Sequence, residues 1–392
     1  MGDELRMRKI YKLLSLILVI SLILPTSVFG ARETAISREK EILQMALKDF
    51  GEMINPEEAK VDIEVEESYN DEDEVRVIVE LQSDPAIVYA NNLGVSFESL
   101  SESVKEKLYE DIIEEQNKVK TQIDSIIDME YIHNFTTVFN GFSGIVKYRD
   151  IRVIESIPSV KSVYIATEYE KPEPVETDMN SSNNMIGTKP VWSLNYKGEG
   201  MTVAILDTGI DYRHKDMVLS ETTKPELNEE KVNELIKEYN LPGKFYTDKV
   251  PYGYNYYDLN NQILDLGPGA SMHGMHVAGT VGANGDVEKG GIKGVAPEVQ
   301  LLAMKVFSND PLYSTTFSDI YLVAIDHSIK LGADAINMSL GSVAGFYKPG
   351  SPEDIAISNA VKNGVIVSVS AGNAGSFTYG YTPEYGYPWA EN

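Results

Sequence analysis

The chain has 392 residues, which is long enough for two domains that each have a hydrophobic core. Its 60 acidic and 34 basic residues give a formal net charge of -26, and this charge argues against binding to nucleic-acid phosphates or to anionic membranes. The sequence contains no cysteine, so disulfide bonds and thiol chemistry are excluded, which is compatible with a large extracellular protein.

Residues 1–30 have the three parts of a secretory signal peptide. A basic segment comes first, an almost wholly apolar segment covers residues 13–24, and small residues precede an expected cleavage between Gly30 and Ala31. The alternative is an uncleaved membrane anchor, but about a dozen apolar residues are too few for a bilayer that needs roughly 20. The pattern therefore predicts export, no membrane span once the signal peptide is removed, and an extracellular or cell-wall location.

The most acidic part of the chain begins directly after the signal peptide. Residues 31–74 form an N-terminal extension that ends in the run Asp71-Glu72-Asp73-Glu74. A short helix is expected over residues 39–50, and the charge of the remainder predicts a solvated, partly disordered segment.

Residues 75–176 are expected to form a small α+β domain followed by a linker. The expected strand, helix, strand, strand, helix and strand are residues 75–81, 97–128, 135–139, 142–146, 150–156 and 160–165. The turn between the second and third strands is Asn140-Gly141, a common hairpin sequence. This βαββαβ order is typical of ferredoxin-like domains. It carries no catalytic group, and its one histidine, His133, is expected to be an ordinary strand residue.

Residues 177–392 predict a doubly wound α/β domain with a mainly parallel sheet. Continuous apolar runs, as buried parallel strands have, occupy residues 202–206, 300–307, 335–340 and 365–369. Helices fit residues 275–281, 318–331 and 353–363. Residues 220–267 are an insertion with an expected helix over 228–239. Ligands of such a domain are expected at the carboxyl ends of the strands.

Asp207 ends an apolar strand, where a carboxylate needs a hydrogen-bond partner. One interpretation is a catalytic aspartate that orients a histidine base. Another is a turn residue, because Asp207-Thr208-Gly209 is a turn sequence. The same three residue types mark aspartic proteases, but those enzymes need two such carboxylates and this sequence has the signature once.

His273 and His276 lie three residues apart at the start of a small-residue helix. The spacing suits a pair of zinc ligands, but the glutamate of a His-Glu-x-x-His motif is missing and no other histidine is near in sequence. We favour His273 as a general base, which the positive end of the helix dipole is expected to keep neutral at rest. His276 is expected to be structural.

The loop Ser370–Gly375 follows the last apolar strand and contains Asn373. An acyl-transfer site needs donors aimed at the developing oxyanion, and the Asn373 side chain is a candidate. The alternative is a loop asparagine in a left-handed conformation. A second segment, Ala335–Ser342, ends a strand in small residues and could present backbone groups to an extended peptide.

Five segments in this order resemble the subtilisin-like (subtilase, S8) serine peptidases, over roughly residues 185–392. The segments are Val203–Asp211, His273–Thr280, Gly294–Pro297, Ser339–Gly341 and Ser370–Gly375. Met275, the long insertion and Gly253-Tyr254-Asn255-Tyr256 resemble the cell-envelope subset, the lactocepin and C5a-peptidase-like enzymes of Gram-positive bacteria. The βαββαβ domain resembles the family's I9-type propeptide, an intramolecular chaperone and inhibitor.

The resemblance implies a role for each matching residue. Asp207 and His273 would be the catalytic aspartate and base, and Asn373 an oxyanion-hole donor. The substrate-binding residues would be Ser339, Leu340, Gly341 and Gly372. Asp216 stands where some members place a calcium ligand, so a structural calcium ion is compatible with the sequence, whereas the chemistry needs no cofactor. Expected partners are protein or peptide substrates and the chain's own propeptide.

The third member of an Asp–His–Ser triad is expected beyond Asn392. No Gly-Thr-Ser or Gly-x-Ser-x-Gly segment precedes that residue, so the chain reads as a precursor fragment that would be inactive alone. In the cell-envelope enzymes a further insert commonly precedes the serine. The alternative from another functional class is a catalytically silent secreted binding protein that keeps the scaffold.

Overall fold

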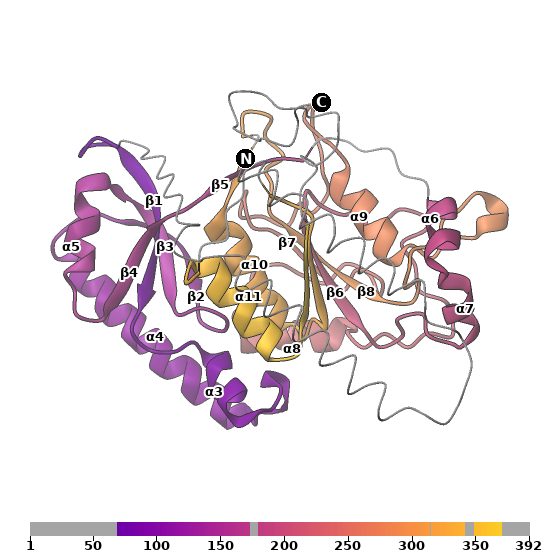
Figure 1. Cartoon of the computed structure of the whole chain (residues 1–392), viewed down its shortest axis with the longest axis horizontal. Helices are drawn as coiled ribbons and strands as arrows, with labels where there is room; N and C mark the ends of the chain where they lie inside the picture. Colours follow the sequence, from indigo (N-terminus) through magenta and orange to yellow (C-terminus); the bar gives the residue numbers. More distant parts are fainter. Residues whose placement is uncertain (1–68, 173–178, 314, 342–348, 371–392) are drawn as a thin grey trace, which may run out of the picture. The chain divides into compact units, whose positions relative to one another are not determined.

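Two main sheets organise the chain, one antiparallel and one parallel (Figure 1). The computed structural model describes residues 69–172, 179–313, 315–341 and 349–370. The expected signal peptide and most of the acidic extension lie outside this part of the chain, as do Gly372 and Asn373. We call residues 69–165 the antiparallel region and residues 179–370 the parallel region.

The antiparallel region has the ferredoxin-like arrangement that the sequence predicts. Its strands lie in the order β2-β3-β1-β4, and every neighbouring pair is antiparallel. The strands are β1 (Glu74–Leu81), β2 (Glu130–Phe135), β3 (Gly141–Lys147) and β4 (Val160–Ile165). The helices are α3 (Ala86–Leu93), η1 (Phe97–Ser99), α4 (Glu102–Asp124), η2 (Tyr148–Asp150) and α5 (Ile151–Glu155).

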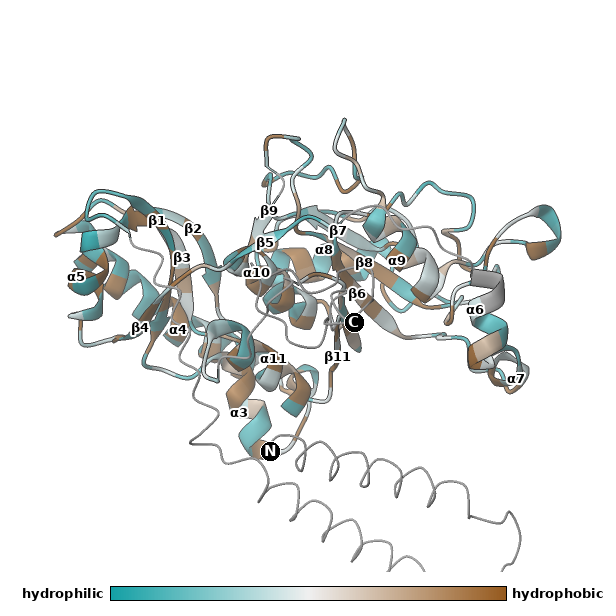
Figure 2. Ribbon diagram, turned by 45° about the horizontal axis from the view of Figure 1, so that its top comes forward, coloured by the Kyte–Doolittle hydropathy of each residue, from teal (hydrophilic) through white to brown (hydrophobic). Residues whose placement is uncertain are grey.

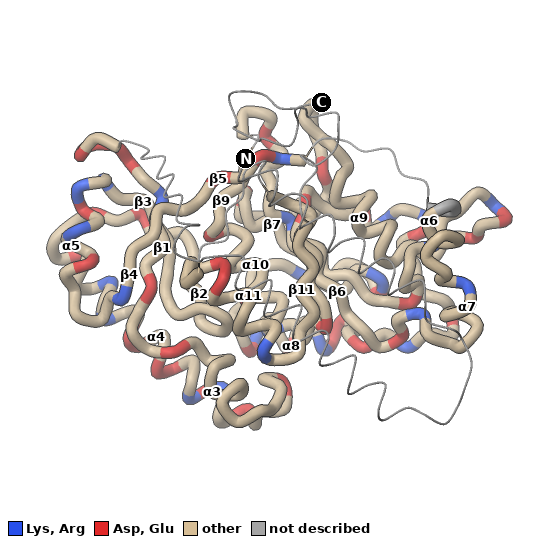
Figure 3. Tube along the Cα trace, in the orientation of Figure 1, with Lys and Arg blue, Asp and Glu red and all other residues tan. Residues whose placement is uncertain are grey.

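The two faces of β1 explain why this sheet forms a layer. Val77 and Val79 point into a core with Val119 of α4, whereas Ile78 on the opposite face belongs to the core of the parallel region. The outer face of α4 is charged, with Lys107–Asp111 and Glu114–Lys118 ion pairs at helical spacing, and Figure 3 shows both signs along this helix. The sheet is therefore buried on both sides.

The predicted strand over residues 135–139 is wrong beyond Phe135. Residues 136–139 leave the sheet because the backbone N–H groups of Thr136, Thr137 and Val138 donate to the Asp326 carboxylate of α10. Asn140-Gly141 is therefore no two-residue hairpin turn. Gly141 is needed for another reason: a Cβ there would lie 1.9 Å from the Val79 carbonyl oxygen across the sheet.

The parallel region is an α/β layer structure, as predicted. Its strands lie in the order β11-β10-β6-β8-β7, all parallel. The strands are β6 (Thr202–Asp207), β7 (Tyr252–Asn255), β8 (Gln300–Lys305), β10 (Ala335–Met338) and β11 (Ile366–Val369). The helices are α6 (Met179–Ile186), α7 (Thr188–Ser193), α8 (Glu229–Glu238), α9 (His273–Gly282), η3 (Val287–Lys289), α10 (Ser318–Lys330) and α11 (Pro352–Lys362).

Alternate residues of β6 point to opposite faces of the parallel sheet. Leu206 packs in one core with α10 and α11, and Ile205 packs in a second core with Ala278 of α9. The apolar strands are thus covered on both sides, and the surrounding helices carry both hydrophobic and hydrophilic residues (Figure 2). No helix within the described ranges has the length and hydrophobicity to cross a membrane.

A short ladder continues the chain beyond the antiparallel region. Strand β5 (Glu168–Glu170) pairs antiparallel with β9 (Thr315–Phe317), which directly precedes α10. The sequence analysis predicted neither strand, and it also missed α3, α6, α7 and β7. In the insertion, the expected helix over 228–239 is confirmed as α8, with the Asn228 side chain accepting the Lys231 N–H at its start.

Candidate active site

Asp207 and His273 meet at the carboxyl edge of the parallel sheet. Asp207 is the last residue of β6, and its side chain is buried. His273 Nδ1 lies 2.8 Å from Asp207 Oδ1 and 3.0 Å from Oδ2. Because a carboxylate only accepts, Nδ1 carries the proton in this contact, which leaves Nε2 of the neutral ring as the acceptor. The two predicted residues therefore form a hydrogen-bonded pair, and no hydrogen bond to Nε2 occurs among the described residues.

The local sequence holds this pair close together. His273 is the first residue of α9, and Gly274 directly after it lies against the loop that follows Asp207. A Cβ on Gly274 would stand 2.6 Å from the Gly209 carbonyl oxygen, so only glycine allows this approach. The Gly274 N–H donates to Thr208 Oγ1 at 3.0 Å, which joins the start of the helix to the end of the strand.

The electrostatics of His273 differ from the expectation based on the helix dipole. Burial alone would lower the pKa of His273, but the Asp207 hydrogen bond and the charges of Asp207 and Asp265 raise it above the usual 6.5. These groups act against the expected effect of the helix dipole, and a neutral resting base stays a prediction.

His276 lies one turn further along α9 and does not join this pair. Its Nδ1 is buried and has no hydrogen-bond partner among the described residues. Over the same residues, no three histidine, cysteine or acidic side chains are arranged to hold a metal ion. The expected structural role of His276 stays a prediction.

Lys305 contacts the loop after Asp207, and the sequence analysis missed it. It ends β8, is fully buried, and its Nζ donates to the Thr208 carbonyl oxygen. Burial lowers the pKa of Lys305 to about 8, against the opposing charges of Asp265, Asp258 and Asp207. A lysine inside the apolar run 300–307 was the available sequence signal.

Asp265 is a carboxylate near His273 that the sequence analysis also missed. Its Oδ2 accepts the backbone N–H groups of Ser271 and Met272, at 3.0 and 2.9 Å, and its Oδ1 accepts Lys171 Nζ at 2.9 Å. Burial alone would raise the pKa of Asp265, but the Lys171 hydrogen bond and the Lys305 charge hold it below the usual value. An acidic residue directly after Ile263-Leu264 was the only sequence signal.

The predicted substrate-binding residues Ser339, Leu340 and Gly341 follow β10 at the same edge of the sheet as Asp207. Ser339 Oγ accepts the Asn337 side-chain amide at 2.9 Å. The Leu340 carbonyl oxygen accepts Ser370 Oγ at 3.0 Å, so this backbone group already has a partner. Gly341 is exposed. The other two predicted residues, Gly372 and Asn373, lie outside the described residues.

The Asp216 carboxylate binds a lysine ammonium and a backbone N–H in this structure, and the calcium site stays a prediction. Its Oδ1 accepts Lys215 Nζ at 2.9 Å, and its Oδ2 accepts the Ile292 N–H at 3.0 Å. Calcium requires six to eight oxygen ligands, and a lysine ammonium competes for the same carboxylate. The loop after Asn284 supplies the Ile292 N–H to this carboxylate, and its Gly290 carbonyl oxygen accepts Lys215 Nζ at 3.3 Å.

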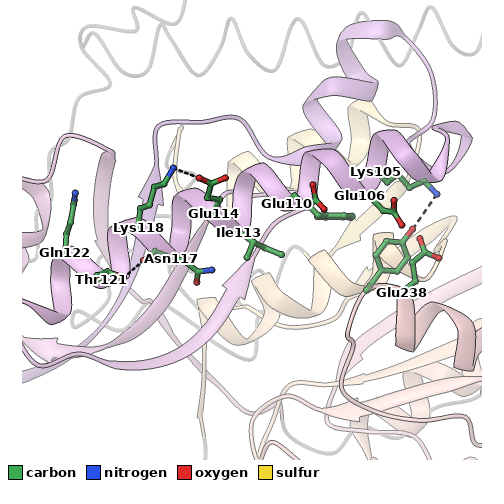
Figure 4. A pocket seen from close by; sticks show the side chains of 12 residues that line it. Lys105, Glu106, Glu110, Ile113, Glu114, Asn117, Lys118, Thr121, Gln122 and Glu238 are labelled. Atoms are coloured by element: carbon green, nitrogen blue, oxygen red, sulfur yellow. Dashed lines mark hydrogen bonds and ion pairs between the residues drawn. The ribbon is translucent and has the colours of Figure 1, made fainter.

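A hollow of about 960 Å³ is lined by residues of α4 and α8 (Figure 4). It runs along the charged outer face of α4 and is closed at one end by Glu238 and Tyr239 of α8. None of the candidate catalytic or substrate-binding residues lines it. The hollow therefore contributes nothing to the Asp207–His273 pair.

Comparisons with known proteins relate this chain to a family of peptidases. Residues 198–390 match the model of the subtilase family of peptidases. The chain is 40% identical over 320 residues to the PII-type proteinase of Lacticaseibacillus paracasei, covering 79% of this chain and 16% of that protein. It is 33% identical over 188 residues to the C5a peptidase of Streptococcus pyogenes, covering 46% and 15% respectively. The chain thus spans about one sixth of the length of these relatives.

Among solved structures, the chain is similar to fervidolysin from Fervidobacterium pennivorans, a keratinolytic enzyme related to subtilisin. The superposition covers 77% of this chain and 40% of that chain, with 18% sequence identity. Its TM-score is 0.45.

Proposed function

Residues 198–390 match the subtilase family of peptidases, and we propose that this chain is the amino-terminal part of an exported serine endopeptidase that hydrolyses peptide bonds in proteins. The observation that carries the proposal is the buried hydrogen bond between Asp207 and His273, at 2.8 Å, within the matched residues. Its place at the carboxyl edge of a parallel sheet is where α/β domains bind their ligands.

In the proposed mechanism, a serine beyond Asn392 attacks the peptide carbonyl while His273 Nε2 takes the hydroxyl proton. His273 then gives that proton to the leaving amine as the C–N bond breaks, and an acyl-enzyme remains. Water hydrolyses the acyl-enzyme with His273 again as base. Asp207 keeps the second ring proton on Nδ1 and stabilises the imidazolium formed in each half of the reaction.

The remaining roles in the proposed site follow from the resemblance to the subtilase family. Asn373 donates its side-chain N–H to the oxyanion of the tetrahedral intermediate. The segment Ser339–Gly341, with Gly372, pairs with the backbone of an extended substrate. The mechanism uses protein groups alone and needs no cofactor.

The antiparallel region is proposed to act as a propeptide that chaperones and inhibits the peptidase domain. Two observations support this role. Its loop 136–138 is bound by the buried Asp326 carboxylate of α10. Its continuation through β5 adds a strand to β9 and ends with Lys171 on Asp265, whose charge acts on His273. A segment lying beside the catalytic pair in this way would block substrate.

Export is proposed from two further features. Residues 1–30 have the composition of a secretory signal peptide, which would be removed after Gly30. The relatives include a proteinase of Lacticaseibacillus paracasei and a C5a peptidase of Streptococcus pyogenes. The sequence around Met275 resembles enzymes of this kind. We accordingly assign the protein to the outside or the wall of a Gram-positive cell.

The test compares two histidine variants of the enzyme expressed from its whole gene. His273→Ala should lower kcat on casein by several orders of magnitude with little change in KM, because a general base acts mainly in the transition state. His276→Ala is the matched control, being the same change one helical turn away, and should lower stability more than kcat.

Two results would refute the proposal. One is casein hydrolysis by His273→Ala at the wild-type rate. The other is an equal loss in both variants together with inhibition by a chelator that zinc reverses, because this pattern belongs to a metal pair.

A further inference from the structure

The ion pair between Lys171 and Asp265 lies immediately beside the catalytic pair. Only 12% of the Lys171 side chain and 1% of the Asp265 side chain are exposed to solvent. One oxygen of the Asp265 carboxylate, Oδ2, accepts the N–H groups of the two residues that precede His273, and these bonds fix its orientation. The other oxygen, Oδ1, is directed to Lys171 at 2.9 Å.

Lys171 reaches Asp265 from an extended strand that is held by its backbone. The ladder between β5 and β9 aligns Glu168 with Phe317 and Glu170 with Thr315, and Lys171 is the next residue along. Backbone pairing of this kind does not depend on the side chains of the added strand. Another extended polypeptide could therefore take the place of β5 and bring a different side chain to Asp265.

The position of Asp265 would select that side chain by charge. A buried carboxylate is costly unless a cation or several donors pair with it. In the present contact Lys171 supplies the cation. The ammonium of Lys305, whose charge also acts on Asp265, is engaged by the Thr208 carbonyl oxygen. Once β5 withdraws, Oδ1 loses its ammonium partner, and a lysine or arginine from another chain would restore the pairing.

We propose that Asp265 is a specificity-determining residue, which binds a lysine or arginine side chain of an extended substrate paired with β9. The inference rests on the proposed function, since it concerns what the same site accepts. The substrate class is polypeptides with a basic residue at the place that Lys171 occupies here. Lys171 is then a mimic of the substrate side chain and leaves with the propeptide.

The test uses the mature enzyme expressed from its whole gene and a set of fluorogenic peptides of one sequence. Lysine, arginine, norleucine or glutamate is placed in turn at each residue upstream of the scissile bond. At one position lysine and arginine should exceed norleucine in kcat/KM by at least about tenfold, as expected for a charge-assisted hydrogen bond in a buried site. Glutamate should be the poorest residue there.

Two variants tie this preference to Asp265. Asp265→Asn keeps an oxygen for the Ser271 and Met272 N–H groups but removes the charge, so the preference should disappear. Asp258→Asn is the matched control. Asp258 is also a carboxylate near Lys305 and accepts the Asn309 N–H at 3.0 Å, but it has no contact with Lys171. The preference should persist in that variant.

The outcomes separate this inference from the proposed function. Casein cleavage without a preference for basic residues, or a preference unchanged in Asp265→Asn, would overturn the specificity role alone. A wild-type enzyme that cleaves neither casein nor any peptide would overturn the proposed function and the specificity role together.

Discussion

Several contacts join residues 69–171 to the parallel region, and those at α10 and at β9 are built differently. At α10, two buried carboxylates bind groups of the antiparallel region. Asp319 accepts hydrogen bonds from Arg76 and Ser143, and Asp326 accepts three backbone N–H groups. At β9, the contact is a three-residue ladder followed by the single ion pair Lys171–Asp265.

From this difference we expect the α10 contact to govern stability and the β9 contact to govern access to the site. The α10 contact is continuous with the main core and contains no candidate catalytic residue. The β9 contact is small, yet it touches Asp265 beside His273. Loss of a few interactions at β9 could therefore expose the site while the α10 contact still holds the two regions together.

Asp326→Ala should have the largest effect on stability. The substitution leaves the N–H groups of Thr137 and Val138 without their acceptor and Lys330 without its carboxylate at 2.7 Å. Removing one member of such a buried network costs about 3–5 kcal/mol. The free energy of unfolding, measured with urea on residues 31–392, should fall by that amount.

A surface ion pair gives the control for Asp326→Ala. Asp111 pairs with Lys107 on the outer face of α4, with both side chains mostly exposed. Asp111→Ala should change the free energy of unfolding by less than about 0.5 kcal/mol. Equal effects of the two substitutions would show that the α10 contact does not stabilise the protein.

The pH dependence of stability should come partly from His133, which lies at the α10 contact. Burial lowers the pKa of His133 to about 4, while Asp319 opposes and Arg76 adds to the shift, and its Nε2 has no hydrogen-bond partner among the described residues. Between pH 6.5 and 4 the unfolded chain binds a proton that the folded protein does not, so stability falls as pH falls through this window. The loss is about 3 kcal/mol.

His133→Gln removes the titrating group and should flatten that part of the curve. Urea unfolding of both proteins at several pH values provides the comparison, with carboxylate protonation common to both. A wild-type curve that is level between pH 6.5 and 4, or identical slopes for the two proteins, would contradict the assignment.

Lys171→Met should lower the free energy of unfolding by less than Asp326→Ala does, about 1–3 kcal/mol, because the buried Asp265 carboxylate loses its cation but keeps the Ser271 and Met272 N–H donors. Hydrogen exchange of the β5 amides should nevertheless become faster, since the ladder is short. Lys161→Met is the matched control, because Lys161 pairs with Glu80 at 2.7 Å away from β9. Faster β5 exchange in the control and not in Lys171→Met would refute the separation of the two contacts.

Most of the fold was predictable because alternation and apolar runs identify strands and their covered faces. The exception is the hairpin. Phe135–Phe139 has the composition of a strand, but the carboxylate of Asp326, distant in sequence, binds its backbone. Such a tertiary contact leaves no trace in the local pattern. The short strands β5, β7 and β9 were missed because three or four residues give no measurable period.

The candidate site was predictable where a motif carried it. Asp207 and His273 were predicted from their segments, and the structure brings them into contact. Lys305 and Asp265 were not, because each acquires its role only through the fold, as a buried charge next to the pair. The upward pKa shift of His273 was missed for the same reason, since Asp265 adds to it from outside the motif.

The most direct test of the Asp207–His273 pair is the pH profile of kcat/KM for the enzyme expressed from its whole gene. The base must be neutral to act, so activity should rise with pH through an apparent pKa above 6.5, because Asp207 raises the pKa of His273. Asp207→Asn should lower kcat by about 10⁴ and move this pKa downward. Wild-type kcat with an unchanged profile in Asp207→Asn would contradict the central claim.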